Sequence, residues 1–143
     1  MFLGEFAHSL DAKNRLIMPA KFRDSLGDQF ITTKGLDNCL FIYSLIEWKK
    51  IEEKIAELPM VRADARAFMR LFLAGANECV LDAQGRMLLA PGHKTYAGID
   101  KEVNVVGVGS RIEIWSMPCW QEYCNRAESE FGSLAERMSD LGI

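Results

Sequence analysis

The sequence predicts an α+β protein made of two tandem, pseudo-symmetric β units with connecting and C-terminal helices. The first observation is a repeated motif, Leu-Asp-Ala-x-(Asn/Gly)-Arg, at residues 10–15 and 81–86. The second is a later match, Ser-x-x-x-Trp, at residues 44–48 and 116–120. The copies are offset by 71 residues at the first motif and by 72 at the second. Two matched blocks in the same order indicate an internal duplication.

Each copy of the first motif is predicted to lie between two short strands. Residues 6–10 and 15–18 flank the first turn, and Pro19 ends the second strand. Asn14 and Gly85 occupy equivalent turn positions, and these residue types adopt positive φ most readily. The simplest interpretation is a tight hairpin in each copy. We place the one inserted residue near Pro19 and its apparent counterpart, Pro91.

A second strand pair is predicted to follow each hairpin. Residues 29–33 and 39–43 form the first pair, and residues 102–106 and 111–115 form the second. Their β-branched content and partial alternation favour strands.

A helix is predicted after each strand pair. Ser44 and Glu47 form a capping box, and Ser116 is the equivalent cap, with Pro118 tolerated in the first turn. The apolar stripe of the first helix is Trp48, Ile51, Ile55 and Leu58. The stripe of the second is Trp120, Cys124, Ala127 and Phe131. Both stripes, including both tryptophans, are predicted to belong to the core.

Two further helices are predicted. Residues 61–74 form a connecting helix that ends at Gly75, and Ser133 begins a short terminal helix through a second capping box with Glu136. The connecting helix carries a basic stripe of Arg62, Arg66 and Arg70. The simpler interpretation is that this stripe faces solvent. The more specific interpretation is that it contacts another subunit or a phosphate.

The resulting organisation is one compact body. It comprises a first β unit (5–47), connecting helices (48–75), a second β unit (76–119) and a C-terminal helical tail (120–143).

Composition is that of an ordinary globular protein, with 49% hydrophobic and 26% charged residues among 143. No apolar run approaches the roughly 18 residues of a membrane span, and no leader-like segment opens the chain, so we expect a cytoplasmic protein without membrane contact. His8 and His93 stand alone, which predicts neither a metal site nor a cofactor. The four cysteines are predicted to be reduced and mostly buried: Cys39, Cys79, Cys119 and Cys124.

The net charge of −3 is unevenly distributed. Residues 102–143 carry three arginines against seven acidic residues, which leaves residues 1–101 close to neutral. A local basic face is therefore compatible with the acidic total.

The repeated motif brings an aspartate and an arginine together at each turn. Asp11 and Asp82 are predicted to structure the loops by accepting turn amides. Arg15 and Arg86 remain open between pairing with these aspartates and binding a ligand, since a guanidinium fits carboxylate, phosphate or guanine edges. Lys13 makes the first loop more basic than the second. One chain has few basic groups, so tight DNA binding requires an oligomer.

Catalytic motifs are absent from the sequence. It contains no GxGxxG, P-loop, GxSxG or HExxH pattern. A small hydrolase would require a paired nucleophile and base that the sequence does not display, so we expect a protein that is not an enzyme.

Several segments together resemble the MraZ family over essentially the whole chain. They are Met1–Phe6, Leu10–Arg15, Met18–Arg23, Glu47–Trp48, Ala76–Cys79, Asp82–Arg86 and Glu113–Trp115. The resemblance implies two SpoVT-AbrB units, in which AbrB-like hairpins are swapped. It implies a transcriptional regulator of the division and cell-wall gene cluster, usually a repressor. Such a protein binds direct repeats in promoter double-stranded DNA, including its own operon, as a nucleoid-associated homo-oligomeric ring of about eight subunits.

The family's DxxxR motifs fall on Asp11, Arg15, Asp82 and Arg86 of this sequence. The resemblance makes Arg15 and Arg86 the best DNA contacts, supported by Lys13, Asn14 and Lys21, while Asp11, Asp82 and Gly85 structure the loops. The chain departs from the family pattern at two positions: Asn14 replaces a glycine, and Gln84 is neutral where a basic residue would help. The alternative function is an AbrB-like antitoxin or interaction module that binds a partner through its C-terminal helices.

Overall fold

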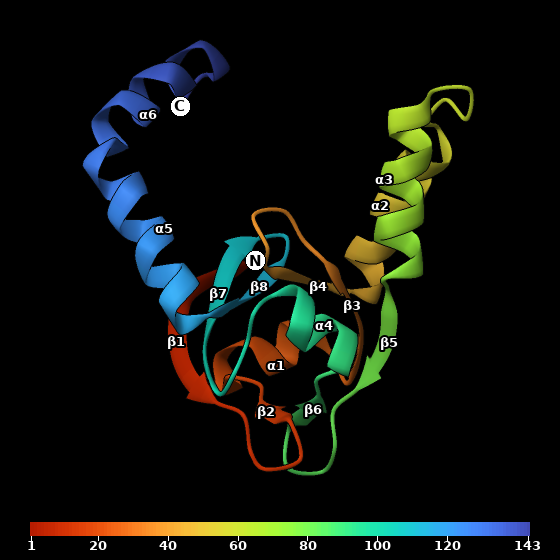
Figure 1. Cartoon of the computed structure of the whole chain (residues 1–143), viewed down its shortest axis with the longest axis vertical. Coiled ribbons are helices and arrows are strands. Elements are labelled where there is room, and N and C mark those ends of the chain that lie inside the picture. Colours follow the sequence, from red (N-terminus) through yellow and green to blue (C-terminus); the bar gives the residue numbers. More distant parts are fainter.

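The computed structural model describes all residues 1–143 as a β-sheet body from which two helical arms project (Figure 1). The first half of the chain forms β1 (Phe2–Ser9), β2 (Arg15–Ile17), α1 (Ala20–Leu26), β3 (Gln29–Lys34), β4 (Leu40–Ser44), α2 (Leu45–Ala56) and α3 (Ala63–Ala74). The second half forms β5 (Asn77–Val80), β6 (Arg86–Leu88), α4 (Pro91–Tyr96), β7 (Glu102–Gly109), β8 (Ile112–Ser116), α5 (Met117–Ser129) and α6 (Phe131–Met138), with a 3-10 turn over Ser139–Leu141. The predicted α+β class is confirmed. No helix combines the length and the apolar character that crossing a bilayer requires.

The two halves exchange their first strands. The main sheet has the order β1-β7-β8-β4-β3-β5, and all of its pairs are antiparallel. Strand β1 of the first half pairs with β7 of the second, whereas β5 of the second half pairs with β3 of the first. The contact between β4 and β8 joins the two three-stranded portions at the centre of the sheet.

The predicted local hairpins are therefore wrong. Strand β1 does not pair with β2, and β5 does not pair with β6; instead β2 and β6 pair with each other in a separate two-stranded ribbon. The physical reason is that each turn closes on itself while its flanking strands continue into different sheets. This is the swapped arrangement that the family resemblance implies. The strand pairs β3–β4 and β7–β8 form as predicted.

The main sheet is buried on both faces at its centre. Alternate residues such as Leu40 and Ile42 of β4 belong to a core of 17 buried residues that includes Leu16 of β2 and Met87 of β6. The intervening residues, such as Phe41 and Tyr43, belong to a second cluster of nine buried residues, which includes residues of α2 and α3 and of strands β7 and β8. Strands buried on both faces give near-continuous apolar runs rather than clean alternation, which explains the partial alternation of the sequence.

Two short helices were not predicted from the sequence. Helix α1 and helix α4 contain seven and six residues, too few to show a helical period. Pro19 is the N-cap of α1, whereas Pro91 is the first residue of α4, so the two prolines are not equivalent. The difference in length between the two copies arises instead after these helices. Residues 27–28 connect α1 to β3, whereas residues 97–101 connect α4 to β7.

The two arms differ in how firmly they rest on the body. In α2, the Ser44 hydroxyl accepts the Glu47 N–H at 3.3 Å, although Glu47 pairs with Lys50 rather than closing the predicted box. Trp48 is buried and stacks on Phe72 of α3, with ring centroids 5.6 Å apart. The predicted apolar stripe of the connecting arm is thus core, as expected.

The C-terminal arm differs from the prediction that its apolar stripe belongs to the core. Ser116 caps α5 as predicted, accepting the Cys119 N–H at 3.3 Å, but no residue of α5 or α6 is buried. Trp120 is only half-buried, and its indole N–H donates to the Glu5 carboxylate at 3.1 Å. Trp120 packs against the core at the base of the arm, but the rest of the stripe does not form core because the arm projects away from the sheet (Figure 1).

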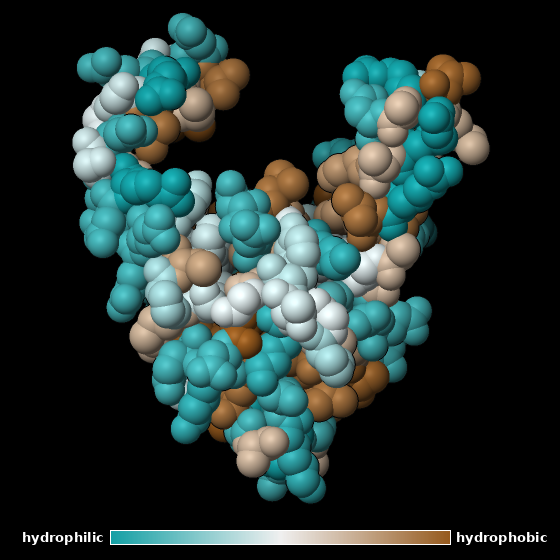
Figure 2. Space-filling view, viewed as in Figure 1, coloured by the Kyte–Doolittle hydropathy of each residue, from teal (hydrophilic) through white to brown (hydrophobic).

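Two smaller predictions also change. Helix α6 begins at Phe131, so Ser133 lies within the helix and does not cap it. Of the four free cysteines only Cys39 is buried, and Cys119 is exposed on the projecting arm. Figure 2 shows apolar side chains on parts of both arms that border the space between them.

Candidate nucleic-acid interface

The two Asp-x-x-x-Arg loops lie side by side at the end of the molecule opposite the arms (Figure 1). In the first loop, the Asp11 N–H donates to the Arg15 carbonyl and the Asn14 N–H donates to the Asp11 carbonyl, both at 3.0 Å. In the second, Asp82 donates to Arg86 at 3.0 Å and Gly85 to Asp82 at 2.9 Å. The sequence repeat is therefore also a repeat of hydrogen bonding.

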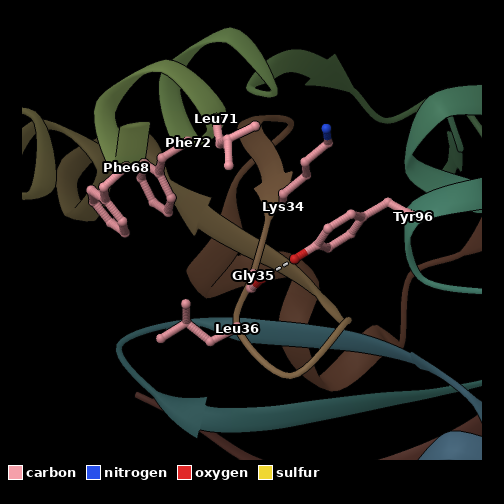
Figure 3. A pocket seen from close by; sticks show the side chains of 7 residues that line it. All are labelled: Lys34, Gly35, Leu36, Phe68, Leu71, Phe72 and Tyr96. Atoms are coloured by element: carbon pink, nitrogen blue, oxygen red, sulfur yellow. Dashed lines mark hydrogen bonds between the residues drawn. The ribbon is translucent and has the colours of Figure 1, made fainter. Parts of the chain in front are cut away.

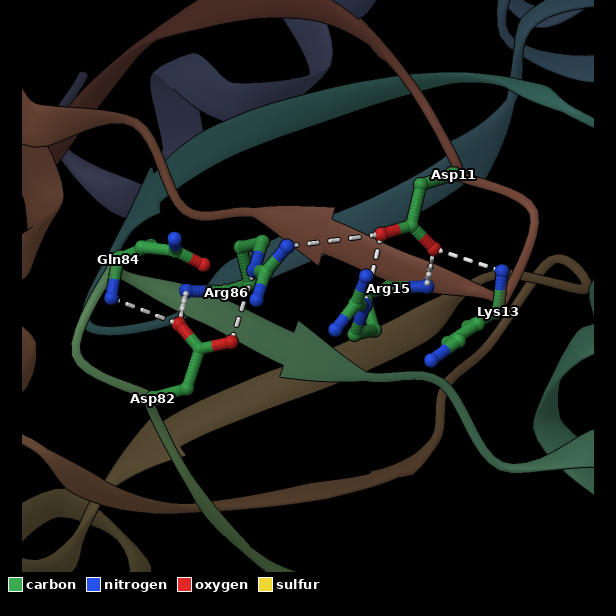
Figure 4. Close-up of polar contacts among 6 residues, drawn as sticks. All are labelled: Asp11, Lys13, Arg15, Asp82, Gln84 and Arg86. Atoms are coloured by element: carbon green, nitrogen blue, oxygen red, sulfur yellow. Dashed lines mark hydrogen bonds and ion pairs between the residues drawn. The ribbon is translucent and has the colours of Figure 1, made fainter.

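Each aspartate gathers the amides of its own loop (Figure 4). Asp11 Oδ1 accepts the N–H groups of Lys13 and Arg15, both at 2.9 Å, and Oδ2 accepts Arg15 Nε at 2.7 Å. These bonds favour the carboxylate, and the Arg15 N–H is the main cause that lowers the pKa of Asp11. These contacts are those of a residue that orders a turn.

The second loop repeats this arrangement. Asp82 accepts the N–H groups of Gln84 and Arg86 at 2.9 Å and Arg86 Nε at 2.8 Å. The Arg86 N–H is the main cause that lowers the pKa of Asp82. The motif needs an aspartate because a short side chain must reach the amides two and four residues further along and the guanidinium at once.

The turn also needs a residue in the left-handed region. Asn14 has φ of 59° and Gly85 has φ of 75°. A Cβ at position 85 would approach the Arg23 guanidinium carbon to 2.5 Å, so glycine also leaves room for that side chain. In the first loop, the Asn14 side-chain oxygen accepts Lys94 Nζ at 3.0 Å.

Each loop is supported by the other half of the chain. The Met18 N–H donates to the Gly85 carbonyl, and the Leu89 N–H donates to the Asn14 carbonyl, both at 2.9 Å. These reciprocal bonds hold the loops as one unit. Two basic residues under the loops, Arg23 of α1 and Lys94 of α4, were not among the predicted site residues. Their spacing of 71 residues, the same as that of the two motifs, was the signal that could have found them.

The ribbon of β2 and β6 presents both motif arginines on its outer face. In the register, Arg15 lies opposite Leu88 and Ile17 lies opposite Arg86. The residues between them, Leu16 and Met87, point into the core. Because side chains alternate along a strand, Arg15 and Arg86 share the outward face.

The two arginines are coupled through one carboxylate. Arg86 Nη1 lies 3.9 Å from Asp11 Oδ2, which also accepts Arg15 Nε (Figure 4). Their side chains are 31% and 23% exposed, so the guanidinium groups are fixed by pairing yet remain accessible.

Most of the predicted site residues are brought together, with one exception. Lys13, Asn14, Arg15 and Arg86 meet at the loops with Asp11, Asp82 and Gly85. Lys21 does not, because its ammonium group lies beside Gly4 of β1. Five basic side chains surround the loops, against two aspartates: Lys13, Arg15, Arg23, Arg86 and Lys94.

A separate pocket lies beside the α3 arm (Figure 3). Its lining is mostly apolar: Lys34, Gly35, Leu36, Phe68, Leu71, Phe72 and Tyr96. The Tyr96 hydroxyl donates to the Gly35 carbonyl at 2.7 Å, and Lys34 Nζ lies 5.3 Å from the Tyr96 ring centroid. Its polar groups are thus engaged with one another, and the pocket offers no convergent set of catalytic side chains.

One family model matches this chain twice. The model described as "MraZ protein, putative antitoxin-like" matches residues 1–71 and residues 72–141, which confirms the duplication. The "Transcriptional regulator MraZ" of Natranaerobius thermophilus is 54% identical over 143 residues, the full length of both chains. The protein of the same name from Carboxydothermus hydrogenoformans is 56% identical over 141 residues, 99% of each chain. That of Moorella thermoacetica is 54% identical over 143 residues, again the full length of both.

Proposed function

We propose that this chain, which belongs to the MraZ family, regulates transcription by binding double-stranded DNA in a sequence-specific manner. Its full-length relatives are named transcriptional regulators, a class of protein that is not enzymatic. One observation supports the assignment of the DNA-binding surface: two arginines lie on the outward face of a two-stranded ribbon, at the end of the body opposite the arms.

The ribbon has the architecture and chemistry that suit a major-groove reader. A B-DNA major groove is about 12 Å wide and admits a two-stranded β-ribbon. Arg15 and Arg86 would read guanine edges through their terminal nitrogens, because their Nε atoms are already engaged by aspartates. Lys13 would contact phosphate, with Asn14 beside it shaping the loop tip. Lys21 is the weakest member of the original set, because it lies beside β1.

The biological setting follows from the family. We infer a cytoplasmic, nucleoid-associated repressor that binds direct repeats in promoters, including that of its own operon, and controls the division and cell-wall gene cluster. Electrostatic binding of this kind weakens with salt, with log K falling by about 0.9 for each phosphate neutralised.

We further propose a homo-oligomeric ring of about eight subunits, built from the two arms. The C-terminal arm carries an unburied apolar stripe, in which Phe131 is 69% exposed. It is also acidic: Glu122, Glu128, Glu130, Glu136 and Asp140. The α3 arm offers the opposite charge and borders the apolar pocket of Figure 3.

The basic stripe of α3 is only partly neutralised within the chain. Arg62 pairs with Asp64 at 2.6 Å and Arg66 donates to the Met60 carbonyl, while Arg70 has no intrachain partner. A head-to-tail contact between unlike surfaces generates a closed ring when the rotation closes. Several loop pairs on one ring would then engage successive repeats with raised effective concentration.

The assignment of the DNA surface is tested by fluorescence anisotropy. A duplex from the region upstream of this chain's own gene and a scrambled duplex are titrated over a salt series. We expect the wild type to prefer the native duplex, and Arg15→Ala/Arg86→Ala to lose that preference, at about 1–3 kcal/mol per arginine and engaged site. Lys21→Ala is the control and should change little. Unchanged sequence preference in a folded double variant would show that the ribbon is not the reading surface.

The alternative, an antitoxin or interaction module, is favoured by the unburied C-terminal arm. Light scattering of the wild type, of Phe131→Glu and of a chain truncated after Gly132 separates the two. Loss of the oligomer in Phe131→Glu, which puts a charge into the apolar stripe, supports the ring. An unchanged oligomer, with a basic partner protein bound only by the full chain, supports the alternative.

A further inference from the structure

We propose that Ile17 and Leu88 are specificity determinants that contact the C5-methyl groups of thymines beside the guanines read by the two arginines. The proposal rests on the proposed function, and it names residues and a base contact that the Asp-x-x-x-Arg motif does not include. It starts from two large aliphatic side chains that the fold leaves uncovered.

The exposure of these side chains follows from the ribbon. In each strand the central residue is buried, Leu16 at 0% and Met87 at 1% exposure, so its neighbours point outward. Ile17 is 46% exposed and Leu88 is 65% exposed, and neither belongs to a core cluster. Single exposed aliphatics are common on protein surfaces. Here, however, two occupy equivalent positions in both copies of a duplicated unit.

Their position relative to the arginines is fixed by the register. Leu88 lies directly opposite Arg15, and Ile17 lies directly opposite Arg86. Directly opposed side chains share a face, with Cβ atoms about 5 Å apart. Each guanidinium therefore has an aliphatic group beside it, displaced by roughly one to two base-pair steps of about 3.4 Å.

The chemistry of the major groove supplies a matching partner. Thymine presents a methyl group there, and it is the only base to do so, whereas guanine presents the acceptors that suit arginine. An arginine and an aliphatic side chain on one ribbon face thus form a reader of adjacent guanine and thymine. Burying the thymine methyl against Ile17 or Leu88 removes apolar surface of both from water.

The two halves are expected to contribute unequally. Val80, which is 63% exposed, lines the same surface groove as Leu88. The residue equivalent to Val80 in the first half is the polar Ser9. The apolar surface formed by Leu88 and Val80 is therefore larger than that of Ile17, and Leu88 lies opposite Arg15, beside the first loop. We expect methyl contacts to matter more for Leu88 than for Ile17.

The test removes single methyl groups from the DNA. Each thymine of the native duplex is replaced in turn by 2′-deoxyuridine, which keeps base pairing, and the Kd is measured by anisotropy for the full chain. At contacted thymines we expect the wild type to lose about fourfold in affinity per methyl group. Leu88→Ala should bind the unmodified duplex more weakly and be insensitive to the replacement at its own thymines. Ile17→Ala should show a smaller effect at different thymines.

Two controls keep the result interpretable. Leu3→Ala removes a leucine that is 57% exposed on β1, away from the ribbon and the α3 arm, and it should retain the full deoxyuridine effect. Ile17→Thr, which keeps a β-branched residue in the strand, replaces Ile17→Ala if that variant folds poorly. If the wild type recognises the native duplex but the deoxyuridine scan is flat, or if Leu88→Ala remains equally sensitive, this inference is overturned while the proposed function stands. If the wild type shows no preference for the native duplex, both are overturned.

Discussion

The first Asp-x-x-x-Arg loop and the second share their internal hydrogen bonds but differ in the side chains at and beneath the tip. The first carries Lys13 and places Asn14 in the left-handed region, where Lys94 holds its side chain. The second carries neutral Gln84 and uses Gly85, against which the Arg23 guanidinium rests. Duplication has therefore conserved the bonding that shapes the turn, while the charge at the tip and the support under it have diverged.

The largest expected effect is on stability, and it shows whether the two strands of the ribbon contribute equally to the core. Leu16→Ala and Met87→Ala each remove a fully buried side chain, and each should lower the free energy of unfolding by about 2–5 kcal/mol. Denaturant unfolding of the two variants measures the costs. Leu88→Ala, at an exposed position of the same ribbon, should change stability by less than about 0.5 kcal/mol. A large difference between the two core variants would show that the halves are unequal in stability as well as in charge.

The next effect concerns the turn conformation. Gly85→Ala should cost about 1–2 kcal/mol, because alanine is strained at positive φ and its Cβ displaces Arg23. Gly85→Asn copies the first loop and should recover part of that cost. The reciprocal Asn14→Gly should be nearly neutral, and thermal unfolding measures all three. Equal costs for Gly85→Ala and Gly85→Asn would indicate that the contact with Arg23 outweighs the backbone strain.

A smaller effect is expected from the charge difference at the tips. Gln84→Lys makes the second loop resemble the first and should steepen the slope of log Kd against log salt by about one, while Lys13→Gln should make it shallower by the same amount. Anisotropy over a salt series on the native duplex gives both slopes. If neither slope changes, the tips do not approach phosphate.

The smallest expected effect is that of changing the pH near neutrality, because the two motif aspartates stay ionised there. The pKa values of Asp11 and Asp82 are both lowered, chiefly by the amides of Arg15 and Arg86. Their stabilising contribution is therefore complete above the ordinary aspartate pKa of about 3.9 and is lost as pH falls through the lowered values. A carbon-13 titration of the two carboxyl groups should give both midpoints below that value. A midpoint at or above it in either loop would contradict the hydrogen bonding described for that loop.

Local features of the fold were predictable from the sequence. The strands around residues 29–33 and 102–106 and the caps at Ser44 and Ser116 depend on neighbouring residues, and they appear where the sequence places them. The repeat also located both loops and the need for positive φ at Asn14 and Gly85.

Strand partners and surface coverage could not be predicted in this way. Strand β1 pairs with β7 because the exchange buries apolar surface of both halves at once, and nothing local in residues 2–9 specifies that partner. The stripe that begins at Trp120 looks like any core stripe, yet beyond Trp120 itself the chain leaves it outside the core. Arg23 and Lys94 could not be predicted as site residues, because their role depends on which loop each one lies beneath.

The strand exchange also dictates the order of events during synthesis. The N-terminal strand cannot pair until β7, which ends at Gly109, has been made, so the growing chain must keep Phe2 and its neighbours uncovered for most of translation. Contacts between such distant residues slow folding and expose apolar surface in the meantime. Neither repeat is then an independent folding unit on the ribosome, and the first half depends on the second to complete its sheet.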